Sequence, residues 1–219
     1  MSAISSCFGA IFTVFGWESS VTRDEALVFI KQQMISEDFS SLKSQPIAPF
    51  AHLYFDRLIG EERVAIWGTE NDQAIFFCAG RGCEVYVVAD QAEIQSFKNA
   101  LSDAFYYLKD GCYQSSNGRG KIFLSSLDGE FDLIYAHGRI SQNNPEMIES
   151  SIGMLKSGEK LIGDIPLHSK EGHWYLPNRA YVHGLFQGVG EVAYCDYDHF
   201  CCSGNVNFII QAPHHRKAH

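Results

Sequence analysis

The chain has 219 residues, of which 46% are hydrophobic and 13% aromatic, and its formal net charge is −9. This composition indicates a globular protein, excludes a disordered chain and argues against a protein that binds duplex nucleic acid, which usually shows a basic surface. The seven cysteines include no C-x-x-C pair, so they indicate neither a disulfide framework nor a zinc site and favour a reducing, cytoplasmic compartment.

Residues 1–60 are predicted to form an N-terminal helical extension or a lid. Their apolar segment Cys7–Trp17 is shorter than the roughly 20 residues that span a bilayer and lacks a basic flank, so we expect it to pack on the core and not in a membrane. Thr22 and Glu25 have the spacing of a capping box, which predicts a helix from there to about Ile35. A polar linker (36–49) and a short helix (52–58) follow.

The stretch from Glu62 to Gln91 has the order of a nucleotide-binding β-α-β unit. A short apolar run (64–66) ends at the turn residue Gly68, an apolar helix (74–79) follows, and a β-branched strand (84–89) leads to Asp90. An acidic side chain at this place can accept hydrogen bonds from a ribose. No G-x-G-x-x-G or P-loop pattern is present, which argues against a P-loop nucleotidase.

Helices and strands then alternate, which predicts an α/β fold with a mostly parallel sheet and helices on both faces. The apolar spacing predicts one long helix over Gln91–Leu108 and another over 145–155. The predicted strands are 121–125, 131–136 and 160–165. Two further strands, 189–197 and 205–211, have no helix between them and are expected to pair antiparallel. Residues 213–219 are expected to be a disordered tail.

Two segments carry a resemblance to a known family. EFDLIYAHGRI (130–140) and MIESSIGMLKSGEKLIGDIP (147–166) are similar to the fourth strand, the following helix and the fifth strand of class I S-adenosylmethionine-dependent methyltransferases. The resemblance covers roughly residues 61–212. It implies a Rossmann-like methyltransferase fold, with a mostly parallel seven-stranded sheet that ends in a C-terminal antiparallel hairpin.

The resemblance also implies a cofactor, S-adenosylmethionine, and a set of site residues. Gly68, Thr69 and Glu70 correspond to the family's glycine turn. Asp90 corresponds to the acid that binds the ribose, with Gln91 beside it, and Asp128 to the acid near the adenine. His137 corresponds to the catalytic position at the end of the fourth strand. The implied reaction is methyl transfer to a small molecule or a protein. His137 would serve as the base for a hydroxyl acceptor, because its unperturbed pKa lies near neutrality.

Several alternatives remain open at this level. His137 could cap a strand, and Asp90 could cap the following helix. Asp164, His168, Glu171 and His173 could hold a metal or lie in a solvated loop, and we expect no metal site. Because the turn has one glycine where the family usually has two or three, a catalytically silent domain that binds a partner is the main alternative to an enzyme. A dehydrogenase is a weaker one, and a homodimer is possible.

Overall fold

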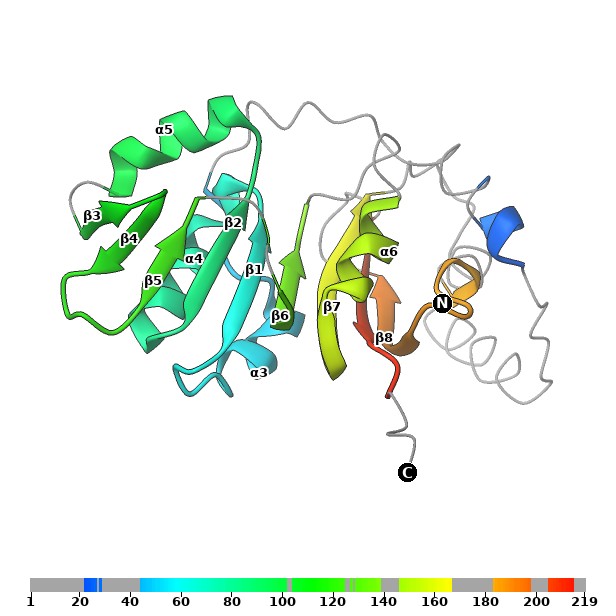
Figure 1. Ribbon diagram of the computed structural model, residues 1–219. Helices are drawn as coiled ribbons and strands as arrows, with labels where there is room; N and C mark the ends of the chain where they lie inside the picture. Colours follow the sequence, from blue (N-terminus) through cyan, green and yellow to red (C-terminus); the bar gives the residue numbers. More distant parts are fainter. Residues whose placement is uncertain are drawn as a thin grey trace, which may run out of the picture.

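The computed structural model describes residues 22–26, 28, 44–101, 104–124, 127, 129–138, 146–166, 183–197 and 205–214. Within these residues, nine strands form one sheet in the order β3-β4-β5-β2-β1-β6-β7-β9-β8 (Figure 1). The strands are β1 (Arg63–Trp67), β2 (Glu84–Val88), β3 (Phe105–Lys109), β4 (Cys112–Ser115), β5 (Lys121–Phe123), β6 (Phe131–Ala136), β7 (Leu155–Pro166), β8 (Glu191–Tyr197) and β9 (Asn205–Gln211). The α-helices are α3 (His52–Phe55), α4 (Asp72–Arg81), α5 (Gln91–Leu101) and α6 (Glu146–Gly153), and the 3-10 helices are η2 (Pro49–Ala51) and η3 (Thr69–Asn71).

The centre of the sheet is parallel. Strands β5, β2, β1, β6 and β7 all run in one direction, and β9 lies antiparallel between β7 and β8. The predicted mostly parallel sheet with a C-terminal antiparallel hairpin is therefore confirmed, and β6 and β9 have the bounds that the sequence predicted.

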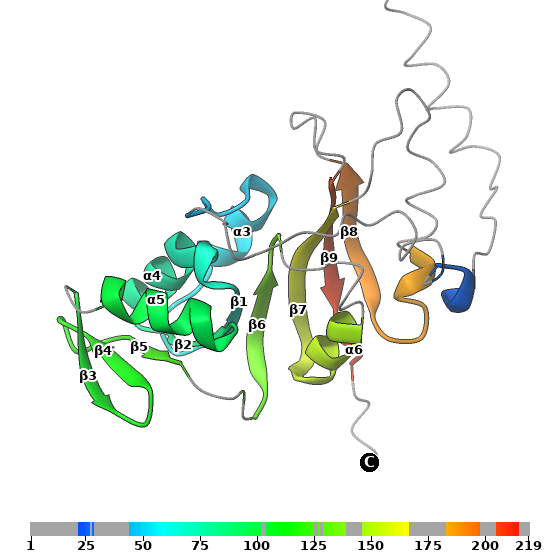
Figure 2. The same cartoon turned by 90° about the horizontal axis from the view of Figure 1, so that it is seen from above.

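Helices cover both faces of the sheet, as predicted. In Figure 2, α3, α4 and α5 lie on one face and α6 lies on the other. Because successive residues of a strand point to opposite faces, each face has its own apolar core. Val64, Ile66 and Val85 belong to the core under α4, whereas Ala65 and Ile134 belong to the core under α6.

The long helix predicted over Gln91–Leu108 is wrong in its second half. Helix α5 ends at Leu101, and Phe105–Lys109 forms strand β3, which pairs with β4 and raises the number of strands in the described sheet to nine. The physical reason is the turn that follows. Asp110 and Gly111 have φ values of 50° and 74°, which is the Asp-Gly turn of a tight hairpin and not the end of a helix.

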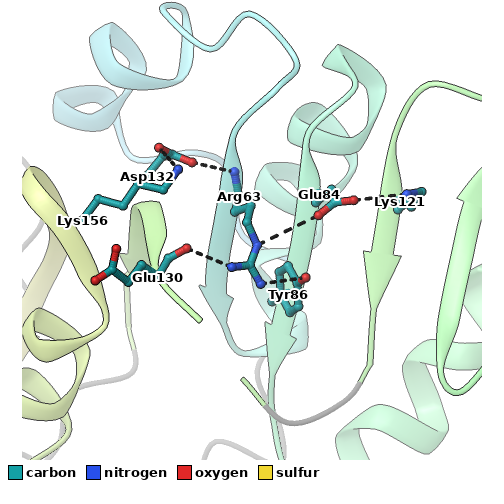
Figure 3. Close-up of polar contacts among 7 residues, drawn as sticks. All are labelled: Arg63, Glu84, Tyr86, Lys121, Glu130, Asp132 and Lys156. Atoms are coloured by element: carbon teal, nitrogen blue, oxygen red, sulfur yellow. Dashed lines mark hydrogen bonds and ion pairs between the residues drawn. The ribbon is translucent and has the colours of Figure 1, made fainter. Parts of the chain in front are cut away.

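A row of alternating charges ties the strands together at their amino ends (Figure 3). Arg63 lies 4.0 Å from Glu84, which in turn binds Lys121 at 3.1 Å, and Lys156 binds Asp132 at 2.6 Å. Arg63 also donates to the carbonyl oxygen of Glu130 at 3.1 Å. It thereby holds the residue that directly precedes β6.

The segment before β1 packs closely on the domain. Its buried side chains join the core under α4; they are Ile47, Ala48, Ala51, Phe55 and Leu58. The backbone N–H of Ala48 donates to the hydroxyl of Tyr135 at 3.0 Å.

The capping box predicted near the N-terminus is confirmed, since Thr22 N–H donates to Glu25 Oε2 at 2.9 Å and Glu25 N–H donates to Thr22 Oγ1 at 3.3 Å. No helix in the described ranges is long and apolar enough to cross a bilayer.

Replacing Tyr135 with phenylalanine is expected to lower the free energy of unfolding by about 1–3 kcal/mol, because the buried N–H of Ala48 loses its acceptor while the ring remains. Urea denaturation measures the change. Tyr107→Phe is the matched control, since Tyr107 is 61% exposed, and it should change stability by less than about 0.5 kcal/mol. Equal stabilities of the two variants would show that the Tyr135 hydroxyl does not hold this segment.

Candidate functional site

Gly68 and Asp90 lie side by side at the carboxyl edge of the sheet. Strands β1 and β2 pair in register from Arg63 and Glu84 to Trp67 and Val88. The next residue, Gly68, donates its N–H to the carbonyl oxygen of Val88 at 2.8 Å. Its φ of 85° is in the left-handed region that favours glycine. Asp90 follows Val88 by two residues and is exposed, so two of the predicted site residues are brought together.

Asp90 caps helix α5. Glu93 N–H donates to Asp90 Oδ1 at 2.8 Å, and Asp90 N–H donates to Glu93 Oε2 at 3.1 Å, which is a reciprocal capping box. No described residue contributes a hydrogen bond to the second oxygen, Oδ2, of the exposed Asp90 carboxylate. The cap therefore leaves Asp90 one oxygen for a ligand. Gln91, the first residue of α5, is also exposed.

The turn after Gly68 is a 3-10 helix, η3, and its last two side chains are buried. Thr69 is partly exposed, Glu70 is 5% exposed and Asn71 is fully buried. Asn71 Nδ2 donates to the carbonyl oxygens of Trp67 at 2.7 Å and of His137 at 2.9 Å. Asn71 thus bridges the ends of the adjacent parallel strands β1 and β6. Sequence analysis missed this residue, because only the fold brings its partner His137 close.

Residues Ser44–Ala48, here called the strap, run over these strand ends. Gln45 N–H donates to the carbonyl oxygen of Glu70 at 2.7 Å, and the Ser44 hydroxyl donates to Asp72 at 2.7 Å. The Gln45 side chain lies against Gly138, where an added Cβ would come within 3.3 Å of Gln45 Oε1. The strap therefore lies against the residues that follow β1 and β6.

His137 is paired with a buried carboxylate. His137 follows β6, and its Nδ1 lies 3.0 Å from Oδ1 of Asp164, which is fully buried in β7. The same oxygen accepts the N–H of Gly138 at 2.5 Å. The His137 side chain is 21% exposed and contacts the ring of Phe50 edge-on, at 6.4 Å between centroids. Asp164 is therefore a strand residue and not part of a solvated loop.

The ionisation of the neighbouring Tyr135 is suppressed. Burial raises the pKa of Tyr135, and the nearby charge of Asp164 raises it further. The phenol consequently stays neutral, while the ring of Tyr135 packs 5.9 Å from that of His137.

Three buried polar atoms around the strand ends have no hydrogen-bond partner among the described residues. They are Gln45 Oε1, Trp67 Nε1 and Asn71 Oδ1. Buried polar groups of native proteins are nearly always paired, so these atoms are candidate contacts for a water molecule or a polar ligand. The two amide oxygens accept hydrogen bonds and the indole N–H of Trp67 donates one, a combination that fits a zwitterion such as an amino acid.

Asp128, His168, Glu171 and His173 lie outside the described residues. In the described part of the chain, no three His, Cys, Asp or Glu side chains are close enough to hold a metal ion.

No protein-family model matches the chain, and no curated protein sequence does either. Solved structures do match. An S-adenosylmethionine-dependent methyltransferase from Methanosarcina mazei has a TM-score of 0.52 at 14% identity, over 78% of this chain and 100% of that one. The chain has the class I methyltransferase fold.

Two further structures share the fold. The magnesium protoporphyrin IX methyltransferase from Synechocystis PCC 6803, with bound S-adenosylmethionine, has a TM-score of 0.53 at 13% identity, over 85% of this chain and 96% of that one. The cyclase SpnF also has a TM-score of 0.53, at 12% identity, over 89% and 97%. The class I methyltransferase fold thus occurs in proteins named for different reactions, so the chemistry has to be argued from the site.

Proposed function

We propose that the protein binds S-adenosylmethionine and transfers its methyl group to a small-molecule or protein acceptor. The observation that carries this proposal is the pairing of Gly68 with Val88 at 2.8 Å, which puts the glycine turn beside the exposed carboxylate of Asp90. In open α/β sheets, ligands bind at the carboxyl ends of the strands. Asp90 Oδ2 would accept hydrogen bonds from the ribose hydroxyls.

The residues at the neighbouring strand ends fit the rest of the cofactor. Its methionine part carries an ammonium and a carboxylate group, and the unpaired atoms of Gln45, Trp67 and Asn71 are hydrogen-bonding groups of both kinds. When bound, the cofactor supplies a methyl group that its sulfonium has already activated. The protein then has to hold the acceptor in line with that group, which can contribute about 7–11 kcal/mol.

His137 is the base in this proposal. Asp164 lies 3.0 Å from Nδ1 and favours the tautomer with the proton on that nitrogen, which leaves Nε2 as the proton acceptor. An acceptor hydroxyl would pass its proton to Nε2 as the methyl group is transferred. Phe50, edge-on to His137, offers an apolar surface for the acceptor.

The compartment proposed for the protein is the cytoplasm. The free thiols of Cys78, Cys83 and Cys112 suit its reducing environment.

The test is the binding of S-adenosylhomocysteine, measured by calorimetry and by thermal denaturation. At a hundredfold excess over the dissociation constant, the ligand should stabilise the protein by about 2.7 kcal/mol. Asp90→Ala should abolish this stabilisation, because the ribose loses its acceptor. Glu61→Ala, which removes an exposed carboxylate at the opposite end of β1, should leave it unchanged. Absence of any stabilisation at millimolar ligand would contradict the proposal.

A second candidate is a catalytically silent domain that binds a partner. It is favoured by one observation, the burial of Glu70 and Asn71 directly after the single glycine of the turn. The same titration separates the two candidates. Binding of S-adenosylhomocysteine supports the enzyme, no binding supports the silent domain, and binding of NAD alone would support a dehydrogenase.

A further inference from the structure

We propose that Gln45 and Asn71 form the subsite for the ammonium group of the cofactor's methionine part. This inference rests on the proposed function and assigns a role to two residues that the sequence analysis did not place in the site. Both side chains lie at the peptide that joins His137 and Gly138. Asn71 donates a hydrogen bond to the carbonyl oxygen of His137, and the side chain of Gln45 lies against Gly138. Each of them carries a buried amide oxygen without a partner among the described residues.

The orientation of the Asn71 amide is fixed by its surroundings. Its Nδ2 donates to two carbonyl oxygens, those of Trp67 and His137, so a flipped amide would place oxygen against oxygen. Both N–H groups are therefore used, and Oδ1 remains an unpaired acceptor in a fully buried side chain. Such an acceptor suits a ligand that only donates hydrogen bonds, and an ammonium group is one.

Gln45 is presented by a segment that is fixed at three points. The strap is held by the Ser44–Asp72, Gln45–Glu70 and Ala48–Tyr135 hydrogen bonds, with lengths of 2.7, 2.7 and 3.0 Å. Its backbone is therefore positioned before any ligand arrives, which lowers the entropy cost of binding. The strap would close the cofactor site at the place where a second and third glycine are missing from the turn.

The charge of this region also favours a cation. Glu70 and Asp72 are adjacent to Asn71 in the chain, and the protein as a whole has a net charge of −9. The ammonium group is thus expected on the side of η3 and the strap.

Calorimetry with two ligands tests the subsite. S-adenosylhomocysteine has the amino-acid part, and 5′-methylthioadenosine lacks it. Wild-type protein is expected to bind S-adenosylhomocysteine more tightly. Gln45→Ala should weaken the binding of S-adenosylhomocysteine about tenfold or more and leave that of 5′-methylthioadenosine unchanged, because a hydrogen bond to a charged group is lost. Gln45→Glu should strengthen the binding of S-adenosylhomocysteine alone, a gain that a folding defect cannot produce.

The controls separate this inference from the proposed function. Gln95→Ala, on the exposed side of α5, should change the binding of neither ligand. Asn71→Ala should also weaken the binding of S-adenosylhomocysteine and leave that of 5′-methylthioadenosine unchanged. The comparison is made on the folded fraction of this variant, which thermal denaturation measures. Equal binding of the two ligands to wild type, or equal losses for both ligands in Gln45→Ala, would overturn the subsite and leave the proposed function intact. Failure of both ligands to bind wild type would overturn both.

Discussion

Replacing Gly120 with alanine is expected to lower the free energy of unfolding by about 3 kcal/mol or more, which is a large share of the roughly 5–15 kcal/mol that stabilises a typical domain. Gly120 precedes β5, and a Cβ on it would overlap with the carbonyl group and Cα of Ala79 in helix α4. These are backbone atoms, so no side chain can rotate away to relieve the overlap. Helix α4 and strand β5 would have to move apart.

Denaturation in urea measures this effect, and a neighbouring glycine provides the control. Gly80 is exposed in α4, and an added Cβ there meets nothing within 4 Å. Gly80→Ala should therefore raise stability, by up to about 1 kcal/mol, because alanine has the higher helix propensity. If Gly120→Ala were as stable as Gly80→Ala, the close packing of β5 on α4 would be refuted.

Replacing Asp164 with alanine is expected to have the largest effect at the candidate site. The substitution leaves the N–H of Gly138 without its acceptor and His137 without its carboxylate, and it should cost about 1–3 kcal/mol of stability. It should also shift the proton of His137 from Nδ1 towards Nε2. Long-range ¹H–¹⁵N spectra of the imidazole report which nitrogen carries the proton.

A double-mutant cycle isolates the pair. If Asp164 and His137 interact as the structure indicates, the stability losses of Asp164→Ala and His137→Ala should not add, and the coupling energy should be at least about 0.5 kcal/mol. Strict additivity, together with an unchanged tautomer in Asp164→Ala, would show that Asp164 does not orient His137.

Much of the sheet could be predicted from local patterns. The apolar runs of β6 and β9 are bounded by turn residues on both sides, so their ends are visible in the sequence. Strand β3 was hidden because Phe105 and Leu108 continue the spacing of α5. The Asp110-Gly111 dipeptide was the signal that could have revealed the hairpin.

The site was predictable only in part. Gly68 and Asp90 stand at the ends of neighbouring strands, and a β-α-β order is enough to place them together. Asn71, Gln45 and Asp164 each contact a residue that is distant in the chain. Asn71 bonds His137, Asp164 bonds Gly138, and the side chain of Gln45 lies against Gly138. No local pattern marks an amide or a carboxylate for such a role.

The row of charges across the amino ends of the strands bears on which residues of this protein can be substituted during evolution. Arg63 and its partners join the strands at the end of the sheet opposite the candidate ligand site. Substitutions at the ligand end therefore leave these ties in place. The residues that hold the strands together at one end of the sheet are thus separate from the residues that would contact a ligand at the other, so ligand contacts can be exchanged without loss of these ion pairs.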